Sequence, residues 1–220
     1  MISTVVGPLR YALVTAAGSQ RWVAPTAIST AAILVLYAQG GDIGTTVAMG
    51  AAVLFVAGAW LAATLAHGEA PDRVAVLASA VGGVHRARLA TLGAAAVWAQ
   101  GLVALSLVAC AVLAGGVTGP WLLAAAVAHE TVVLAGLALG AVGAPPLVLR
   151  GGWSLAAVLT GALVETAVPH AAPVRLLIDA LGSRSPTSPP WTLLVSLLVA
   201  TAAASAGVVA GVWSWGWRRG

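Results

Sequence analysis

Six long runs of apolar, almost uncharged residues constrain this chain more than any other feature of its sequence. A helix needs roughly 20 mostly apolar residues to cross the hydrocarbon core of a bilayer, within a usual range of about 17–25. Because the runs hold well over half of the 220 residues, we predict an all-α integral membrane protein with one transmembrane domain, residues 1–220. The predicted spans are Trp22–Ala38, Ile43–Ala66, Leu89–Ala114, Trp121–Val142, Gly152–Val168 and Thr192–Trp213.

Composition supports this prediction and excludes other classes of protein. Hydrophobic residues make up 60% of the chain and charged residues 7%, against about 45–50% and about 25% in soluble domains. The sequence pI of about 10.6 comes from ten arginines spread along the chain, with no lysine. This spread differs from the basic patch of a nucleic-acid-binding protein. We therefore expect a multi-pass membrane protein that binds no nucleic acid.

The arginines predict which way the spans cross the membrane. Loops on the cytoplasmic side of a membrane protein carry an excess of Lys and Arg. With a cytoplasmic N-terminus, eight of the ten arginines lie in inside segments, and only Arg175 and Arg184 lie in outside segments. We therefore expect both termini on the cytoplasmic side.

Two segments outside the spans are each expected to form a helix: an interfacial helix near the N-terminus, and an external helix that dips into the outer leaflet or caps the bundle. Within residues 1–21, the run Val5–Ala17 places its larger apolar residues on one face, as an interfacial helix does. In the external loop 169–190, Pro173 favours the start of a short helix and Gly182 favours its end. A cleaved signal peptide is the alternative for the N-terminal segment, and a plain surface connection is the alternative for the external loop.

The cytoplasmic loop 67–88 is longer than a turn requires, and its sequence predicts another short helix. Pro71 suits a first helical turn, apolar residues recur at helical spacing, and Gly82-Gly83 ends the pattern. The expected helix is Pro71–Val81. Such a helix either rests on lipid head groups through its apolar face or docks a cytoplasmic subunit, and the residues leave both interpretations open.

Three ionisable side chains fall within predicted spans: His129, Glu130 and Glu165. A charge at mid-bilayer costs a few kcal/mol even on the lenient insertion scale, so such residues normally face a bundle interior or a water-filled path. They are candidates for a proton relay, a cation site or the polar lining of a translocation path. The alternative is a structural hydrogen bond, with Glu130 protonated or paired with a helix Ser or Thr. For Glu165, near the outer interface, the alternative is solvation or a pair with Arg175.

The sequence lacks the residues of several catalytic sites. Without lysine, the chain has no phosphate-binding loop of the G-x-x-x-x-G-K-[ST] type. The aspartates Asp42, Asp72 and Asp179 all lie outside the predicted spans, which excludes an intramembrane aspartyl pair. Cys110 is the only cysteine, so no disulfide or thiolate metal site is expected. We expect no enzyme activity, no cofactor and no metal in this chain.

Two segments resemble a known family. They are GSQRWVAP (Gly18–Pro25) and EAPDRVAVLASAVGGVHRARLATL (Glu69–Leu92), and Trp60 precedes the second. Together with the expected order of spans and surface helices, they are similar to small actinobacterial permeases of the ABC-2 (type V) family of ABC exporters. The chain departs from many members in having Ala78-Ser79 without a proline, and arginine where they have lysine.

The resemblance implies a division of tasks between subunits. Permeases of this family form dimers in which each copy binds a separate ATPase. It therefore implies two copies of an ABC ATPase that bind ATP and Mg²⁺, and a second copy of this chain or a related permease. Pro71–Val81 corresponds to the coupling helix that docks on the ATPase, and Leu9–Ala17 to the connecting helix that leans on it. The docking residues implied are Glu69, Asp72, Arg73, Ala78, Ser79 and Arg86.

The resemblance also implies a function and a location. The expected location is the bacterial cytoplasmic (inner) membrane, where lipid surrounds the chain. The expected function is that of a permease that moves a small hydrophobic or amphipathic compound, a lipid or a peptide outward. Spans two and five line the dimer interface in this family, so Trp60 and Glu165 join His129 and Glu130 as candidates for the translocation path. Two alternatives stay open: a proton-coupled secondary carrier that uses Glu130 and Glu165, and a non-transporting scaffold subunit.

Overall fold

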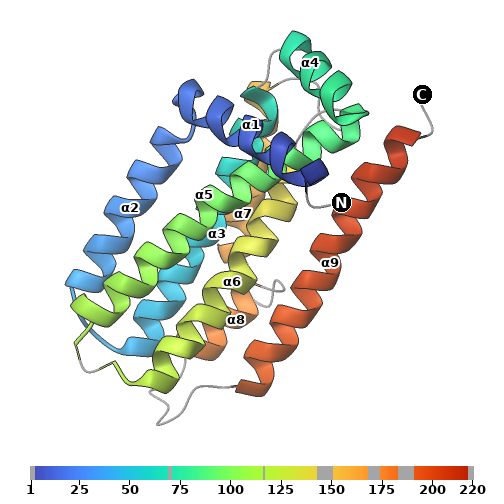
Figure 1. Ribbon diagram of the computed structural model, residues 1–220. Coiled ribbons are helices and arrows are strands. Elements are labelled where there is room, and N and C mark those ends of the chain that lie inside the picture. The colour runs from blue at the N-terminus through green and yellow to red at the C-terminus, as the bar shows by residue number, and fades with distance from the viewer. Residues whose placement is uncertain are drawn as a thin grey trace.

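The computed structural model of the chain describes residues 3–68, 71–115, 117–142, 151–167, 174–182 and 191–217. These residues form helices joined by short connections, and no strand occurs among them. The all-α prediction is therefore confirmed for this part of the chain. The helices, in chain order (Figure 1), are α1 (Ser3–Ser19), α2 (Val23–Ala38), α3 (Ile43–Gly68), α4 (Pro71–Val81), α5 (Val84–Leu113), α6 (Gly119–Val142), α7 (Gly151–Ala167), α8 (Val174–Gly182) and α9 (Trp191–Trp217).

Four of the described helices, α3, α5, α6 and α9, are long and apolar enough to cross a membrane. The pair α1 and α2 adds a fifth candidate if it is counted as one span, although the two helices are bent by 81°. α2 has 16 residues and α7 has 17, which is at or below the length that crosses the hydrocarbon core. The structure thus agrees with a multi-pass membrane protein, whereas the count of six spans stays a prediction.

Each predicted apolar run corresponds to one helix, but several helices extend beyond their runs. α5 begins at Val84 instead of the predicted Leu89, and α9 continues to Trp217 instead of ending at Trp213. A span was predicted only from the length of apolar sequence, whereas a helix continues wherever backbone hydrogen bonds continue. The short helix between Pro71 and Val81 has the predicted bounds, and α8 lies where the external helix was expected.

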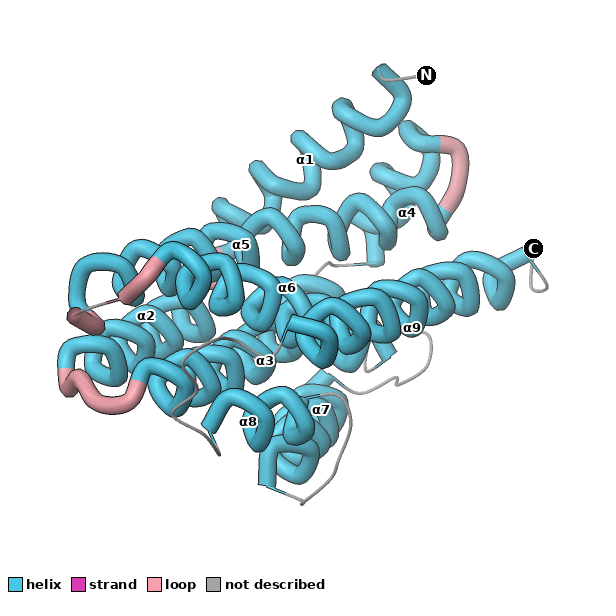
Figure 2. The backbone as a smooth tube through the Cα atoms, turned by 90° about the horizontal axis from the view of Figure 1, so that it is seen from below, coloured by secondary structure: helices cyan, strands magenta, loops and turns pink. Residues whose placement is uncertain are grey.

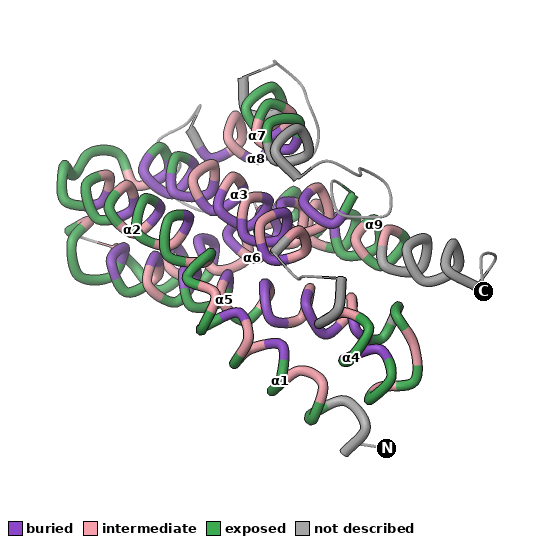
Figure 3. The backbone as a smooth tube through the Cα atoms, turned by 90° about the horizontal axis from the view of Figure 1, so that it is seen from above, coloured by how far each residue is buried: buried purple, intermediate pink, exposed green. Residues whose placement is uncertain are grey.

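α3 is the central helix of the bundle. In the most apolar stretch of 18 residues of α3, 72% is buried, whereas in the corresponding stretch of α9 only 11% is buried. Figure 3 shows the same contrast: buried residues concentrate on α3 and α6, and α9 lies at the edge with most of its described surface exposed. In a bilayer these exposed apolar surfaces face lipid or another protein.

Two glycines allow α3 and α6 to approach each other closely. Gly136 and Gly140 are four residues apart on α6 and face α3. A Cβ atom on Gly136 would meet the carbonyl oxygen of Phe55, and one on Gly140 would meet that of Ala59. Small residues at this spacing are typical of helix pairs in membranes, where close backbone packing drives association. The helix pair at the centre of the bundle therefore depends on these two positions.

The remaining helices occupy the two ends of the bundle. α1 and α4 lie across one end, called here the α4 end, and the end of α9 lies there too (Figures 1 and 2). α8 lies at the opposite end, the α8 end, where Leu177 and Leu181 are fully buried and the Leu181 carbonyl contacts Gly44 of α3. The expected surface helices are thus at opposite ends of the bundle.

The elbow between α1 and α2 is held by an aromatic pair. Gln20 takes a positive φ of 55° where the chain turns. Trp22 follows, donates a hydrogen bond from Nε1 to the Ala17 carbonyl oxygen at 3.1 Å, and stacks on Trp98 of α5 with ring centroids 4.1 Å apart. α1 is therefore fixed across the end of the bundle instead of continuing into α2.

Replacing Gly136 by alanine is expected to lower the stability of the bundle by about 1–3 kcal/mol, because the added methyl group forces α3 and α6 apart. The matched control is Gly207→Ala on α9, where an added Cβ meets nothing within 4 Å. That variant is expected to be neutral or slightly stabilising, since alanine favours a helix over glycine. Thermal unfolding of the purified chain in detergent measures both. Equal midpoints for the two variants would contradict the close approach of α3 and α6.

Candidate functional site

α4 ends in a glycine turn that fixes its direction. Gly82 has a φ of 80°, and the Gly83 N–H donates to the Ala78 carbonyl oxygen at 2.8 Å. This is a C-terminal cap in which the positive φ favours glycine, because other residues pay roughly 1–2 kcal/mol in that region. α5 begins directly after the turn, and its Ala87 packs on Leu77 and Ala78 of α4. α4 is therefore firmly attached to the start of α5.

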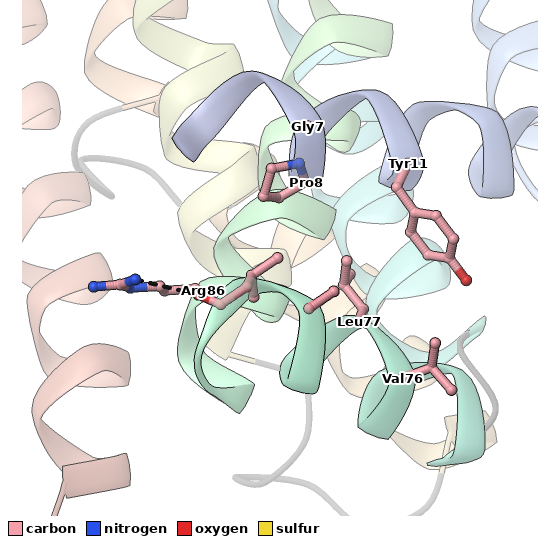
Figure 4. A pocket seen from close by; sticks show the side chains of 8 residues that line it. Gly7, Pro8, Tyr11, Val76, Leu77 and Arg86 are labelled. Atoms are coloured by element: carbon pink, nitrogen blue, oxygen red, sulfur yellow. Dashed lines mark hydrogen bonds between the residues drawn. The ribbon is translucent and has the colours of Figure 1, made fainter. Parts of the chain in front are cut away.

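A pocket of about 410 Å³ lies between α1 and α4. Figure 4 shows Tyr11 reaching from α1 toward α4, with Pro8 above Leu77 and with Arg86 at the other end of the pocket. Arg86 donates from Nη1 to the Val81 carbonyl oxygen at 3.2 Å, so part of its guanidinium group caps α4. The pocket thus has an apolar floor and two polar side chains at its rim. Its lining residues are Gly7, Pro8, Tyr11, Val76, Leu77, Ala80, Val81 and Arg86.

Two of the expected docking residues lie on the exposed surface at this end. Ser79 and Arg86 are both exposed. Ser79 also donates from Oγ to the Val76 carbonyl oxygen at 2.8 Å, a bond within its own helix turn. Both side chains are therefore accessible on the surface of this end of the bundle.

Ala78, another expected docking residue, lies on the opposite face of α4. Its side chain is 8% exposed and packs with Leu77 and Ala87. It therefore stabilises the attachment of α4 to α5 and offers a partner almost no surface. Asp72 and Arg73 belong to α4, but the description does not extend to their side chains, and Glu69 lies outside the described residues.

Sequence reasoning missed Val76, the most exposed large apolar side chain of α4 at 62% exposure. It lines the pocket between α1 and α4. The signal was present, because Val76 is an apolar residue that does not share the helical spacing of Val74, Leu77 and Val81. Val76 therefore places an exposed apolar side chain of α4 at the pocket.

His129, a candidate for the translocation path, is fully buried inside the bundle. Its Nε2 lies 3.5 Å from the Tyr37 hydroxyl, which in turn accepts from Ser106 Oγ at 3.4 Å. This polar cluster joins α2, α5 and α6, and it is enclosed in the described structure. Among the described residues, no group of three or more His, Cys, Asp or Glu side chains is placed to hold a metal ion.

Glu130 points to a different face of α6. The Gln100 amide of α5 donates from Nε2 to Glu130 Oε2 at 2.8 Å. Glu130 is half-buried and Gln100 is exposed, so this pair lies on the outer surface of the described bundle. Although they are adjacent in sequence, His129 and Glu130 do not share a site.

The structure describes the two other candidates for the translocation path, Trp60 and Glu165, in less detail. Trp60 is half-buried on α3, and its carbonyl oxygen accepts a hydrogen bond from Thr64 Oγ1 at 2.8 Å. Glu165 belongs to α7, but the description does not extend to its side chain. Nothing in the described structure joins either residue to Glu130.

Comparison of the chain with family models, with curated proteins and with solved structures finds no match. Any functional conclusion therefore depends on the residues and on their arrangement.

The role of the buried cluster can be tested with the two tyrosines of the chain. Tyr37→Phe removes the hydroxyl that His129 and Ser106 share, and is expected to destabilise the bundle by about 1–3 kcal/mol because buried polar groups lose their partner. Tyr11→Phe is the matched control, since Tyr11 is 41% exposed. Thermal unfolding in lipid nanodiscs compares the two. A Tyr37→Phe midpoint equal to that of Tyr11→Phe would show that the cluster adds no stability.

Proposed function

We propose that this chain is the membrane-spanning permease subunit of an ATP-driven exporter of the ABC-2 type. In this proposal it moves a small hydrophobic or amphipathic compound, a lipid or a peptide outward, and a separate ATPase supplies the energy. The observation that supports the proposal most is the exposed surface at the α4 end, where α4 and α1 enclose a pocket with an apolar floor.

The proposed topology has six spans with both termini in the cytoplasm. α2 and α7 then cross the membrane as short spans, with 16 and 17 residues, which a bilayer accommodates by local thinning. The exposed arginines Arg10, Arg21 and Arg86 belong to the α4 end, and an arginine excess favours the cytoplasmic side. On this basis α8 is external, and the membrane is the bacterial cytoplasmic membrane.

The need for a separate ATPase follows from the residues of the chain. With no lysine, it cannot form the phosphate-binding loop of an ABC ATPase. The outer face of α4 presents exposed Val76 and Ser79, which are small and uncharged and suit insertion into a groove of a partner. We propose that two ATPase copies dock on two permease copies in this way, or on this chain and a related permease.

The attachment of α4 provides a route for coupling. The glycine turn and the packing of Ala78 on Ala87 hold α4 on the start of α5. A displacement of α4 by the ATPase therefore also displaces α5, which continues through the bundle and reaches α6 through the bond between Gln100 and Glu130. Movement of α5 against α6 is the proposed first step in opening a path across the membrane.

The proposal predicts that an ATPase co-purifies with the tagged chain from its native membrane in mild detergent. Val76→Asp is expected to abolish co-purification, because a charge on the exposed face opposes burial in a partner groove. Thr118→Asp, an exposed position at the α8 end, is the matched control and is expected to keep the ATPase. Mass spectrometry of the purified material identifies and quantifies the partner.

Ala78→Asp provides a second comparison. Because Ala78 is buried between α4 and α5, its replacement is expected to lower thermal stability, which Val76→Asp leaves unchanged. Recovery of the wild-type chain without an ATPase above background would overturn the proposed function.

A further inference from the structure

The hydrogen bond between Gln100 of α5 and Glu130 of α6 lies at an unusual place for a polar pair. Both residues are near the middle of their helices, which are long and apolar enough to span a membrane. Gln100 is exposed and Glu130 is half-buried. Lipid tails offer no hydrogen-bond partner, so a polar pair on the outer surface at this depth is unfavourable unless another polar group covers it.

The Gln100 amide keeps hydrogen-bonding capacity after it has bonded to Glu130. A primary amide has two N–H donors and a carbonyl oxygen that accepts. Among the described residues, Gln100 Nε2 donates to Glu130 Oε2 at 2.8 Å, and the Gln100 side chain makes no other hydrogen bond. One N–H group and the carbonyl oxygen, Oε1, are therefore left for a partner that offers one acceptor and one donor.

A second glutamine amide offers this combination. Two primary amides that face each other across a two-fold axis form two equivalent hydrogen bonds, because each donates to the carbonyl oxygen of the other. Two copies of one chain that cross a membrane in the same orientation place their Gln100 residues at the same depth. An unrelated protein needs a polar group of its own at that depth, whereas a second copy brings one with it. The remaining capacity of Gln100 thus matches a second Gln100.

The surface around Gln100 allows two α5 helices to approach each other. Gly101 and Ala104 lie beside it on the exposed face of α5, and a Cβ atom on Gly101 would meet nothing within 4 Å. Val97 and Val108 extend this face in both directions and are 48% and 60% exposed. Small residues beside a polar side chain are typical of helix contacts in membranes, because they let the backbones come close enough for polar groups to bond across the contact.

We propose that this face of α5, called here the Gln100 face (Val97, Gln100, Gly101, Ala104 and Val108), is the contact between two copies of the chain in the membrane. In this contact the two Gln100 amides bond to each other, and Glu130 positions each amide within its own copy. α5 lies on the opposite side of the bundle from α7 and α8 (Figures 2 and 3). The contact therefore differs from the one through α3 and α7 that the family resemblance implies.

This inference goes beyond the proposed function, which leaves open whether the second permease is a copy of this chain. The contact requires neither ATP nor an ATPase, so it is measured on this chain alone, and the two proposals can fail separately.

The first test measures association of the full chain in phosphatidylcholine liposomes. Copies that carry a donor or an acceptor fluorophore at the C-terminus report association by energy transfer as the ratio of protein to lipid is varied. Gln100→Leu is expected to weaken association by about tenfold, because the reciprocal amide bonds are lost. Gln39→Leu is the matched control, since Gln39 is exposed at the end of α2, and it is expected to associate like the wild type.

Gly101→Leu separates association from folding. Because the position is open, leucine fits within a single copy and favours a helix over glycine. Thermal stability, measured at a protein-to-lipid ratio that keeps the copies separate, should therefore not fall. The leucine side chain holds two α5 helices apart, so association should weaken by about tenfold or more. Gly207→Leu on α9, where an added Cβ also meets nothing within 4 Å, is the matched control and is expected to associate like the wild type.

Cysteine cross-linking locates the contact. Cys110 is the only cysteine of the chain and is fully buried, so the wild type is expected to stay uncross-linked. Ala104→Cys, one helical turn from Gln100, is expected to join two copies through a short thiol-reactive linker. Leu163→Cys is the matched control, because Leu163 is 60% exposed on α7, and it is expected to give single chains.

Three results would overturn the inference. The first is equal association of the wild type and Gln100→Leu. The second is cross-linking of Leu163→Cys in place of Ala104→Cys, which would put the contact at α7. The third is a wild-type chain that stays single at every ratio of protein to lipid. Recovery of the chain without an ATPase bears on the proposed function and on none of these results.

Discussion

The backbone contact between α3 and α6 determines where the other helices can lie. In lipid, apolar side chains gain little by leaving one apolar environment for another, so helices associate through close packing and hydrogen bonds. Gly136 and Gly140 bring the α6 backbone against the carbonyl groups of Phe55 and Ala59. The helices α2, α5, α7, α8 and α9 pack around this pair, so α3 and α6 are buried on several sides.

The same close approach explains why the interior of the bundle tolerates a histidine. Gly50 of α3 has no side chain to occupy the space beside Tyr37 and His129, and a Cβ there would lie 2.9 Å from the Tyr37 hydroxyl. The hydroxyl instead lies between His129 and Ser106. A small residue on the central helix therefore makes room for polar groups from three neighbouring helices, and their mutual contacts reduce the cost of removing them from water.

The sequence was informative where the determinants are local. Pro71 and Gly82-Gly83 predicted the bounds of α4 because a first-turn proline and a positive-φ glycine act within a few residues. The inward position of Ala78 was missed, since it depends on Ala87 of the following helix. The partner of His129 could not be found at all, because Tyr37 is 92 residues away and only the packing of α2 and α6 brings them together. Gln100 was missed for the same reason, and the bounds of α5 and α9 differ from those of the predicted spans because apolar sequence alone does not fix where a helix begins and ends.

The adjacent residues His129 and Glu130 of α6 lie in two different environments. Successive residues on an α-helix are rotated by about 100°, so the two side chains leave α6 toward different neighbours. His129 is directed to the enclosed cluster with Tyr37, where its contacts join helices, whereas Glu130 is directed to Gln100 on the outer surface. His129 is thus fully enclosed, whereas Glu130 is only half-buried. The face of α6 that carries Glu130 and the helix α4 are both joined to α5, the first by the hydrogen bond from Gln100 and the second by the glycine turn and the packing of Ala78 on Ala87.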